Sequence, residues 1–379
     1  MFFQNKSLIF AFLFIIIYSY NNKLLKYKNY INICRRKEFI NQYINNIPDN
    51  IFLTIGLPTY NMEKYIESSL LSIINQSFKY FEIIVVNDNS NDNTQNIISN
   101  IQNKDKRIKC INHSKNLGVY SSRSDAIFNA AGKYILLMDP DDLLLNQDIF
   151  QELYDYNQKY NLDIIEFLVY HQIEGVKDII FPTLELLNHH HNFTKNIIKQ
   201  PELSEILFYD PSSKNYSSII CRTIWNKLIR KEIMDHTINY INKGCFKNQF
   251  LIAADDTPLN ILTFQFSNNY SNINIPGYLY NLRADGMSYD TKRNIEHDVI
   301  LSHNYLLYLK LLYQYVIDFN KDINFFFYEF QLFSIYLERL KDLNIKKYNP
   351  ILINFCQELR RRNIPTQYRK VIDELLSGF

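Results

Sequence analysis

The stretch Lys133–Asn146, with the sequence KYILLMDPDDLLLN, places an apolar run directly before a group of acids. The run Tyr134–Met138 has no charged residue, which is typical of a strand that is buried on both faces. Asp139, Asp141 and Asp142 follow it at once, with a proline in the turn. We therefore expect a buried strand that delivers its carboxylates to the edge of a sheet.

The same alternation of apolar runs and amphipathic stretches precedes this strand. Asn61 would be the N-cap of the first amphipathic stretch. Strands that are separated by single helices indicate βαβ crossovers, so the predicted class is α/β, with a mostly parallel, Rossmann-like sheet flanked by helices. We expect strands at residues 51–58, 81–88, 107–113 and 133–139, and helices at residues 61–78, 91–102 and 119–132.

Polar residues stand at the ends of these predicted strands, where open parallel sheets bind their ligands. Asp88, Asp139 and the loop Thr59–Asn61 all lie at such ends. Asp139 and Asp141 could converge on one Mg²⁺ or Mn²⁺ ion, because these cations prefer oxygen ligands and also take phosphate oxygens. Such an ion would neutralise a diphosphate leaving group. The alternative is a plain loop in which Asp142 only caps a following helix.

Length, charge and cysteine content narrow the class of protein. The chain has 379 residues, a net charge of +2 and 15% aromatic side chains. This length suits one large domain with appended segments, and the nearly neutral charge gives no support for nucleic-acid binding. The five cysteines are scattered without C-x-x-C spacing, so we expect neither a zinc site nor a disulfide framework.

The segment Leu8–Tyr18, with the sequence LIFAFLFIIIY, is almost wholly apolar. We interpret residues 1–50 as an uncleaved membrane anchor followed by a stem; a cleaved signal peptide and a buried helix are the alternatives. More Lys and Arg residues follow the segment than precede it, which favours a cytosolic body by the positive-inside rule. The expectation is a single-pass membrane protein, in an endomembrane if the source is eukaryotic, and its orientation stays open.

Four segments carry a resemblance to a known family. They are LPTYNMEKYIESSLLSIINQSFKYFEIIVVNDNSNDNT from Leu57, NLGVYSSRSDAIFNAAGKYILLMDPDD from Asn116, IWNKLIRKEI from Ile224 and AADDTPLNIL from Ala253. Together with a looser match at Tyr280–Ser288, they make the chain similar to family 2 glycosyltransferases with the GT-A fold.

The resemblance implies an enzyme, a glycosyltransferase of the hexosyltransferase type, with a GT-A domain at residues 51–293. It would move a sugar from a nucleotide-diphosphate sugar, by preference a UDP-sugar, to a hydroxyl group of a glycan, lipid or protein. Metal dependence and inversion at the anomeric carbon are implied as well. Residues 294–379 lie beyond the match, and we expect them to form a helical extension.

The nucleotide-binding residues carry over position by position. By resemblance, Pro58 and Tyr60 lie against the nucleotide base, and Asp88 contacts the base. The family usually has two consecutive aspartates at the last of these positions, whereas this chain has Asn87 before Asp88.

The residues around the diphosphate carry over in the same way. Arg123 matches an arginine near the diphosphate, and a plain arginine on a helix surface is the alternative. The family follows this arginine with Asn and then Gly, where Ser124 and Ala126 stand here. Asp139 would face the ribose and the metal, and Asp141 would face the metal.

The resemblance also suggests a catalytic base and an acceptor-side residue. Asp256 aligns with the catalytic aspartate of the family, while Asp255 replaces its usual glutamate. Asp256 would take the acceptor proton; the alternatives are Asp255 in that role, or an N-cap function for Asp256 before the helix at Thr257. Trp225 would lie near the acceptor, and a core tryptophan is the equal alternative.

Two other classes of function stay open at this stage. A catalytically silent relative that binds nucleotides or glycans would explain the departures at Asn87, Ser124 and Asp255. A nucleotidyltransferase would use a similar sheet and metal, but such enzymes generally carry a glycine-rich phosphate loop near the first strand, and LPTYNMEKY has no glycine.

Overall fold

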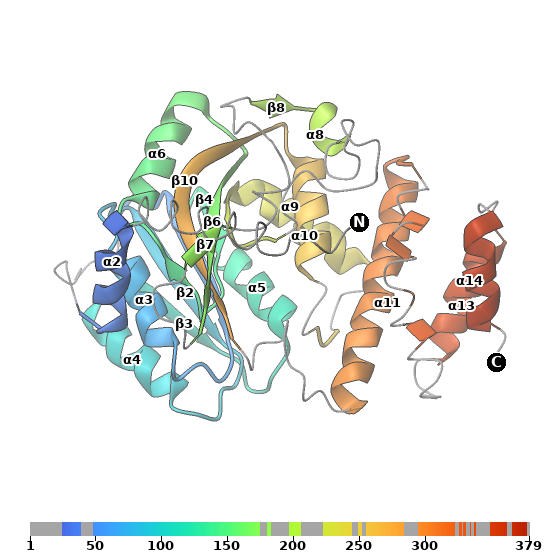
Figure 1. The fold of residues 1–379 in the computed structure, drawn as a ribbon, viewed down its shortest axis with the longest axis horizontal. Helices are drawn as coiled ribbons and strands as arrows, with labels where there is room; N and C mark the ends of the chain where they lie inside the picture. The colour runs from blue at the N-terminus through green and yellow to red at the C-terminus, as the bar shows by residue number, and fades with distance from the viewer. Residues whose placement is uncertain are drawn as a thin grey trace, which may run out of the picture.

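The computed structural model places a ten-stranded sheet at the centre of the chain. Helices cover both faces of this sheet, and a helical region continues beyond it (Figure 1). The structure describes residues 25–38, 48–174, 180–182, 197–205, 223–244, 249–251, 255–283, 295–322, 326–327, 329–330, 334, 337–338, 349–361 and 366–376.

The first four strands form the parallel unit that the sequence predicts. Their order in the sheet is β3-β2-β1-β4, and each pair within it is parallel. β1 and β2 are buried along their whole length, in keeping with their mostly apolar sequences. The buried Glu82 of β2 accepts a hydrogen bond from the Thr54 hydroxyl of β1 at 2.8 Å. The elements are β1 (Leu53–Thr59), α3 (Ile66–Ile74), β2 (Phe81–Asn87), α4 (Thr94–Lys104), β3 (Ile108–Asn112), α5 (Val119–Phe128) and β4 (Tyr134–Leu137).

The second half of the sheet mixes strand directions. The main order is β3-β2-β1-β4-β9-β6-β10-β5, while β7 pairs with β6 and β8 pairs with β10 off this path. β9 is antiparallel to both of its neighbours, so β6 and β10 run in the same direction as β1 to β4. The prediction that most strands of the sheet run parallel is therefore confirmed. The elements are β5 (Leu143–Leu144), α6 (Ile149–Tyr160), β6 (Ile164–Ile173), β7 (Ile180–Pro182), β8 (Ile198–Lys199), α8 (Glu202–Glu205), β9 (Lys227–Arg230), α9 (Lys231–Lys243), α10 (Asp256–Phe266) and β10 (Asn269–Leu282).

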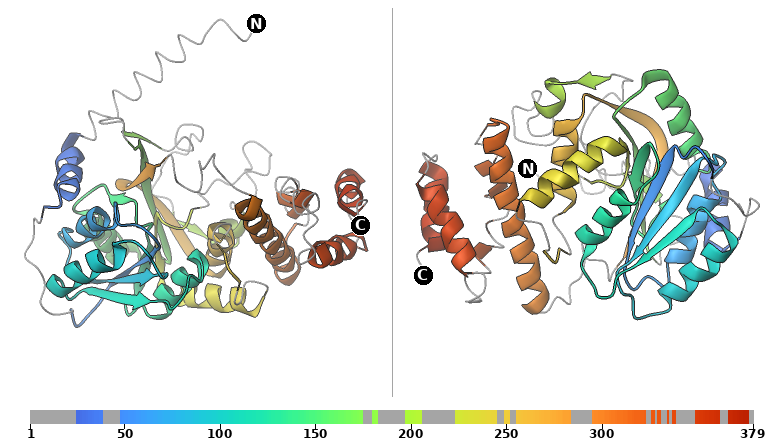
Figure 2. Two further views of the ribbon diagram at one scale, coloured as in Figure 1. Left: turned by 90° about the horizontal axis from the view of Figure 1, so that it is seen from below. Right: turned by 180° about the vertical axis from the view of Figure 1, so that it is seen from behind.

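The two faces of the sheet bury separate cores. On β2, Ile83 and Val85 pack with the residues of α3, α4 and α6, whereas Ile84 and Val86 pack against Ala126 of α5. This alternation follows the period of two in a strand. Figures 1 and 2 show α3 and α4 on one side of the sheet and α5, α9 and α10 on the other.

Helix α2 (Leu25–Arg35) lies in the region predicted as a stem, and it packs against the sheet domain. Tyr30 donates a hydrogen bond from its hydroxyl to the Ser72 carbonyl oxygen on α3, at 2.5 Å. Ile31 of α2 joins a buried cluster with Leu143 of β5. The helix therefore supports the strand that follows the acidic turn.

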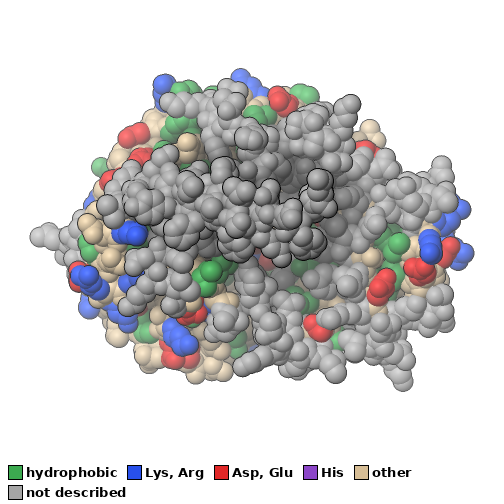
Figure 3. Space-filling view, in the orientation of Figure 1, with side chains coloured by type: hydrophobic (Ala, Val, Ile, Leu, Met, Phe, Trp, Pro, Cys, Tyr) green, Lys and Arg blue, Asp and Glu red, His purple; other side chains and the backbone are tan. Residues whose placement is uncertain are grey.

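The predicted anchor, residues 8–18, lies outside the described residues. Within the described ranges, no helix combines the length and the apolar character that crossing a bilayer requires. On the described part of the face in Figure 3, Lys and Arg side chains are interspersed with Asp and Glu side chains, in keeping with the net charge of +2.

Helices also occupy the described parts of residues 294–379. They include α11 (Ile295–Asp318), α13 (Asn349–Arg360) and α14 (Thr366–Leu376). Buried residues of α11 belong to the same apolar cluster as those of α9 and α10. Figure 2 shows α13 and α14 beyond α11, on the side away from the sheet.

The order of the strands fixes where a ligand can bind. The chain steps outward from β1 to β2 and β3, and then returns to the opposite side of β1 for β4. Open α/β sheets bind their ligands beside such a reversal, at the carboxyl ends of the strands, and we call this place between β1 and β4 the ligand crevice. The loop after Thr59 and the turn at Asp139 border this crevice.

Candidate functional site

The loops after β1 and β2 are tied together by hydrogen bonds. The Asn91 backbone N–H donates to the Asn61 side-chain oxygen at 2.9 Å, and the Asn61 N–H donates to Ser90 Oγ at 3.0 Å. Asn61 has a left-handed backbone, with a φ of 54°, and α3 begins only at Ile66. The prediction of Asn61 as N-cap is therefore wrong, because its side chain joins two loops instead.

The predicted base-contacting residues lie at this crevice. Pro58 is buried within β1, Tyr60 keeps 41% of its surface exposed in the loop that follows, and Asp88 is only 3% exposed. The Asp88 carboxylate accepts hydrogen bonds from the backbone N–H groups of Leu117 and Gly118, at 2.7 and 2.8 Å. Asp88 thus joins the end of β2 to the start of α5, and its contact with a base stays a prediction.

Arg123 of α5 forms the centre of the acidic cluster. Its Nη2 donates to Asp139 at 2.9 Å, and its Nη1 donates to Asp255 at 2.7 Å and also to Asp256. The Arg123 side chain is only 5% exposed, so the alternative of a plain surface arginine is wrong. One buried cation brings together acids from β4 and from the start of α10.

The environment of Asp256 changes its acidity. Desolvation raises the pKa of its carboxyl to about 7; Arg123 opposes this shift, while the negative charge of Asp255 adds to it. The Asp256 side chain remains 31% exposed, whereas that of Asp255 is 4% exposed. A carboxyl group with solvent access and a pKa near neutral suits a general base.

The start of α10 tests whether Asp256 caps this helix. The N-cap position is Asp255, and it makes no side-chain capping hydrogen bond; Asp256 is the first helical residue. The N-cap alternative for Asp256 is therefore wrong. Both carboxylates point to Arg123 instead.

Tyr278 and Arg283 fix the acidic turn after β4. The Tyr278 hydroxyl donates to Asp142 at 2.7 Å and accepts the Asp139 backbone N–H at 3.1 Å. Asp142 is fully buried and precedes β5, not a helix, so the alternative that it caps a following helix is wrong. Asp141 pairs with Arg283 at 2.8 Å.

The acidic turn fits a divalent cation by the chemistry of its donors. Asp139, Asp255 and Asp256 share Arg123, and Asp141 pairs with Arg283, so the ionised cluster holds four carboxylates against two guanidinium groups. A Mg²⁺ or Mn²⁺ ion would offset this excess of negative charge with the oxygen ligands it prefers. In the described ranges, no three His, Cys, Asp or Glu side chains are grouped to hold a metal, so the fit rests on Asp139 and Asp141.

Trp225 packs against the tyrosines of β10 that border the acidic turn. It is 6% exposed and stacks on Tyr278 and Tyr280, with ring centroids 4.7 and 5.3 Å away. Its neighbour Lys227 is fully buried and lies 3.5 Å from Glu166. Trp225 therefore packs on the tyrosine that holds the acidic turn, and its contact with an acceptor stays a prediction.

Three residues that shape this site were not identified from the sequence: Tyr278, Arg283 and His113. The first two lie about 140 positions from the acids that they contact, and no local pattern signals such a pairing. His113 directly follows β3, so the rule that ligand residues stand at strand ends could have identified it.

The chain is similar to several known proteins. Residues 54–238 match the family model described as Glycosyl transferase family 2. The uncharacterized glycosyltransferase EpsJ of Bacillus subtilis (strain 168) is 26% identical over 228 residues, 60% of each chain. The GalNAc(5)-diNAcBac-PP-undecaprenol beta-1,3-glucosyltransferase of Campylobacter jejuni is 34% identical over 109 residues, 28% of this chain and 35% of that protein.

A solved structure shares the fold. S. aureus TarS 1-349 in complex with UDP-GlcNAc superposes with a TM-score of 0.50 and 19% identity, over 77% of this chain and 80% of that chain. The chain spans less than two thirds of the length of the two curated relatives above. Its fold is GT-A-like, and residues 54–238 are similar to the Glycosyl transferase family 2 domain.

Proposed function

We propose that the chain transfers a hexosyl group from a UDP-sugar to a hydroxyl acceptor on a glycan, lipid or protein. The observation that carries this proposal is the bridge by Arg123 between Asp139, at the crevice, and Asp256, a carboxyl group suited to act as a base. The UDP-GlcNAc bound by TarS and the glucosyltransferase name of the C. jejuni relative support a UDP-hexose donor.

The donor would lie across the carboxyl ends of β1, β2 and β4. Tyr60 and Pro58 would flank the base, and Asp88 would accept a hydrogen bond from it. The backbone N–H groups of Leu117 and Gly118 and the ring of His113 contact the Asp88 carboxylate, which has about four acceptor positions, so one position remains for a base N–H. Arg123 would lie near the diphosphate.

Asp139 and Asp141 would hold a Mn²⁺ or Mg²⁺ ion. When bound, the ion supplies positive charge that neutralises the diphosphate leaving group. Asp141 and Arg283 form an ion pair at 2.8 Å, and the Arg283 guanidinium could also donate to a phosphate oxygen of the donor.

Asp256 would act as the base of an inverting transfer. The acceptor oxygen attacks the anomeric carbon and loses its proton to Asp256. The bond from the anomeric carbon to the phosphate oxygen breaks, and its electron pair leaves with UDP. With a pKa of about 7, about half of the Asp256 carboxyl groups are ionised at pH 7 and can accept a proton.

The test is product release by the full-length chain with a panel of UDP- and GDP-sugars. We expect UDP release that is faster with a hydroxyl acceptor than without. Nucleotide binding with no release from any sugar would favour a silent relative. Pyrophosphate release from nucleoside triphosphates would favour a nucleotidyltransferase.

A membrane location through residues 8–18 remains part of the proposal. Full-length protein should stay in the membrane pellet after a carbonate wash. A variant that begins at Lys23 keeps α2, whose Tyr30 bonds to α3, and should be soluble. If expression of the full-length chain yields soluble protein that lacks its N-terminus, the segment is a cleaved signal peptide instead.

A further inference from the structure

His113 lies between two carboxylates beside the proposed base-binding site. Its Nδ1 is 2.7 Å from Asp88 Oδ1, at the end of β2, and its Nε2 is 2.8 Å from Asp125 Oδ2, on α5. The His113 side chain is 6% exposed, whereas that of Asp125 is 42% exposed. The ring thus joins the end of a strand to a helix at the ligand edge.

The partners of the ring decide its protonation state. A neutral imidazole has one N–H donor and one nitrogen acceptor, whereas an imidazolium has two donors. An ionised carboxylate can only accept hydrogen bonds. Because both ring nitrogens of His113 face carboxylates, the geometry is satisfied when both carry a proton. Burial lowers the pKa of His113, but the hydrogen bonds and negative charges of Asp88 and Asp125 outweigh burial and raise it above its usual value.

Asp88 transmits this contact to the start of α5. Gly118, at the N-cap position of α5, donates to Asp88 Oδ2 and has a φ of 90°. A Cβ at Gly118 would lie 2.5 Å from the Leu251 carbonyl oxygen, so only glycine fits this turn. The Val119 N–H donates to the same carbonyl oxygen at 2.8 Å. The turn therefore connects Asp88 to the helix that carries Arg123.

We propose that His113 is a positioning residue, an imidazolium that holds Asp88 and α5 in the arrangement that receives the nucleotide. This inference rests on the proposed function for its nucleotide, a nucleoside diphosphate, but the protonation state of the ring can be measured independently. The charged groups that face the ring are Asp88 from the end of β2 and Asp125 from α5.

The first experiment measures the ring directly. In full-length protein labelled with ¹⁵N-histidine, the ring shifts of His113, assigned by comparison with His113→Gln, should report two protonated nitrogens at pH 7. Asp125→Asn removes one of the two negative charges, so the ring should lose its proton at a lower pH in this variant. A neutral ring at pH 7 in the wild type would overturn the proposal.

The second experiment measures UDP binding by calorimetry. His113→Gln should raise the Kd for UDP about tenfold or more, the scale of a hydrogen bond to a charged group. The Kd of the wild type should rise as the pH passes the pKa of His113, and that of His113→Gln should not. His236→Gln is the matched control, because His236 is exposed on α9. Circular dichroism verifies the fold of each variant.

Two results would overturn different claims. If His113→Gln binds UDP as the wild type does, with the same pH dependence, the positioning role is wrong. If the wild type binds no nucleoside diphosphate, the proposed function is wrong, and the nucleotide part of this inference is overturned with it. If His113→Gln does not fold, the ring shifts and UDP affinity of the wild type and Asp125→Asn still decide the proposal.

Discussion

Arg123 lies 2.9 Å from the carboxylate of Asp139, and this contact joins helix α5 to the end of strand β4. The same guanidinium group contacts Asp255 and Asp256, at the start of α10. Arginine suits this position, because its planar group presents several N–H donors in fixed directions. The relative placement of the proposed base and the acidic turn therefore depends on one side chain.

Arg123→Lys should lower both stability and transfer. A lysine ammonium cannot reproduce the planar fork that contacts three carboxylates, and Asp255, only 4% exposed, would lose its partner. Breaking a buried ion pair costs about 3–5 kcal/mol, and the retained charge of lysine should keep the loss below that range. Urea unfolding and UDP release measure the two effects. The control is Arg230→Lys, at an ion pair with Asp163; equal losses in both variants would contradict a special role for Arg123.

Asp256→Asn should abolish most of the transfer with little change in UDP affinity. General acid–base catalysis contributes about 10²- to 10⁴-fold, and kcat should fall within that range. Asp255→Asn should lose much less, because Arg123 keeps its contacts with Asp139 and Asp256. Steady-state kinetics and calorimetry with UDP measure both variants. A larger loss of kcat in Asp255→Asn than in Asp256→Asn would show that the assignment of the base to Asp256 is wrong.

The pH profile of kcat should have an acid limb near pH 7. The pKa of Asp256 is raised to about 7, so its active, ionised form disappears as the pH falls below that value. Stability should change in the opposite direction to kcat. Between the unfolded pKa of about 3.9 and pH 7, only the folded state holds this proton, so the contribution of Asp256 to stability falls as the pH rises. An acid limb near pH 4 would contradict the raised pKa.

Chelation should stop transfer, and a divalent cation should restore it. EDTA is expected to abolish UDP release, and Mn²⁺ or Mg²⁺ to recover it, because Asp139 and Asp141 supply the oxygen ligands. Asp141→Asn should weaken UDP binding only when the metal is present. Asp148→Asn, at an exposed position before α6, is the matched control. Full activity in the chelator would refute metal dependence.

The sequence predicted the parallel half of the sheet because each element there is local. β1, β2 and β4 are short, mostly apolar stretches, a helix follows each of β1 and β2 along the chain, and α5 precedes β4. The antiparallel strand β9 and the pairing of β5 with β10 depend on contacts between distant segments. No local period encodes such contacts, so they were not predicted.

Several residues of the site could be predicted from local motifs, but their contacts could not. Asp139 and Arg123 were identified by motif and position, and the structure brings them together. Their contacts could not be read from the sequence, because Arg123 and Asp256 are 133 positions apart. Asn61 shows the opposite case: its residue type suits an N-cap, but hydrogen bonds to the next loop determine its conformation.

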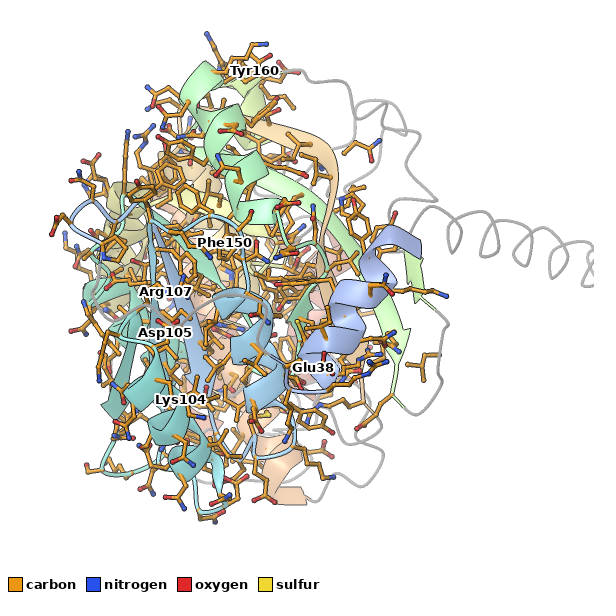
Figure 4. The ribbon with its side chains drawn as sticks, turned by 90° about the vertical axis from the view of Figure 1, so that its left-hand side faces the viewer. Glu38, Lys104, Asp105, Arg107, Phe150 and Tyr160 are labelled. Atoms are coloured by element: carbon orange, nitrogen blue, oxygen red, sulfur yellow. The ribbon has the colours of Figure 1, made fainter. Side chains whose placement is uncertain are left out.

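The amino end of the sheet carries a buried ion pair that should contribute to stability and not to catalysis. Arg107 and Asp105 are both fully buried, and Arg107 Nη2 donates to the Asp105 carboxylate at 2.7 Å (Figure 4). Arg107 also lies over the Phe81 ring, 4.2 Å from its centroid. The pair stands just before β3, at the edge of the sheet opposite to the ligand crevice.

Asp105→Asn should therefore destabilise the fold by about 3–5 kcal/mol, because it leaves a buried guanidinium without its counter-charge. The double variant Asp105→Asn with Arg107→Met should recover part of this loss, since an apolar side chain has no charge to desolvate. Lys106→Gln, at the exposed position between them, should change stability by less than about 0.5 kcal/mol. Urea unfolding measures all three variants, and kcat should stay near wild type where the protein is folded. A loss of kcat in folded Asp105→Asn would mean that this end of the sheet is coupled to the crevice.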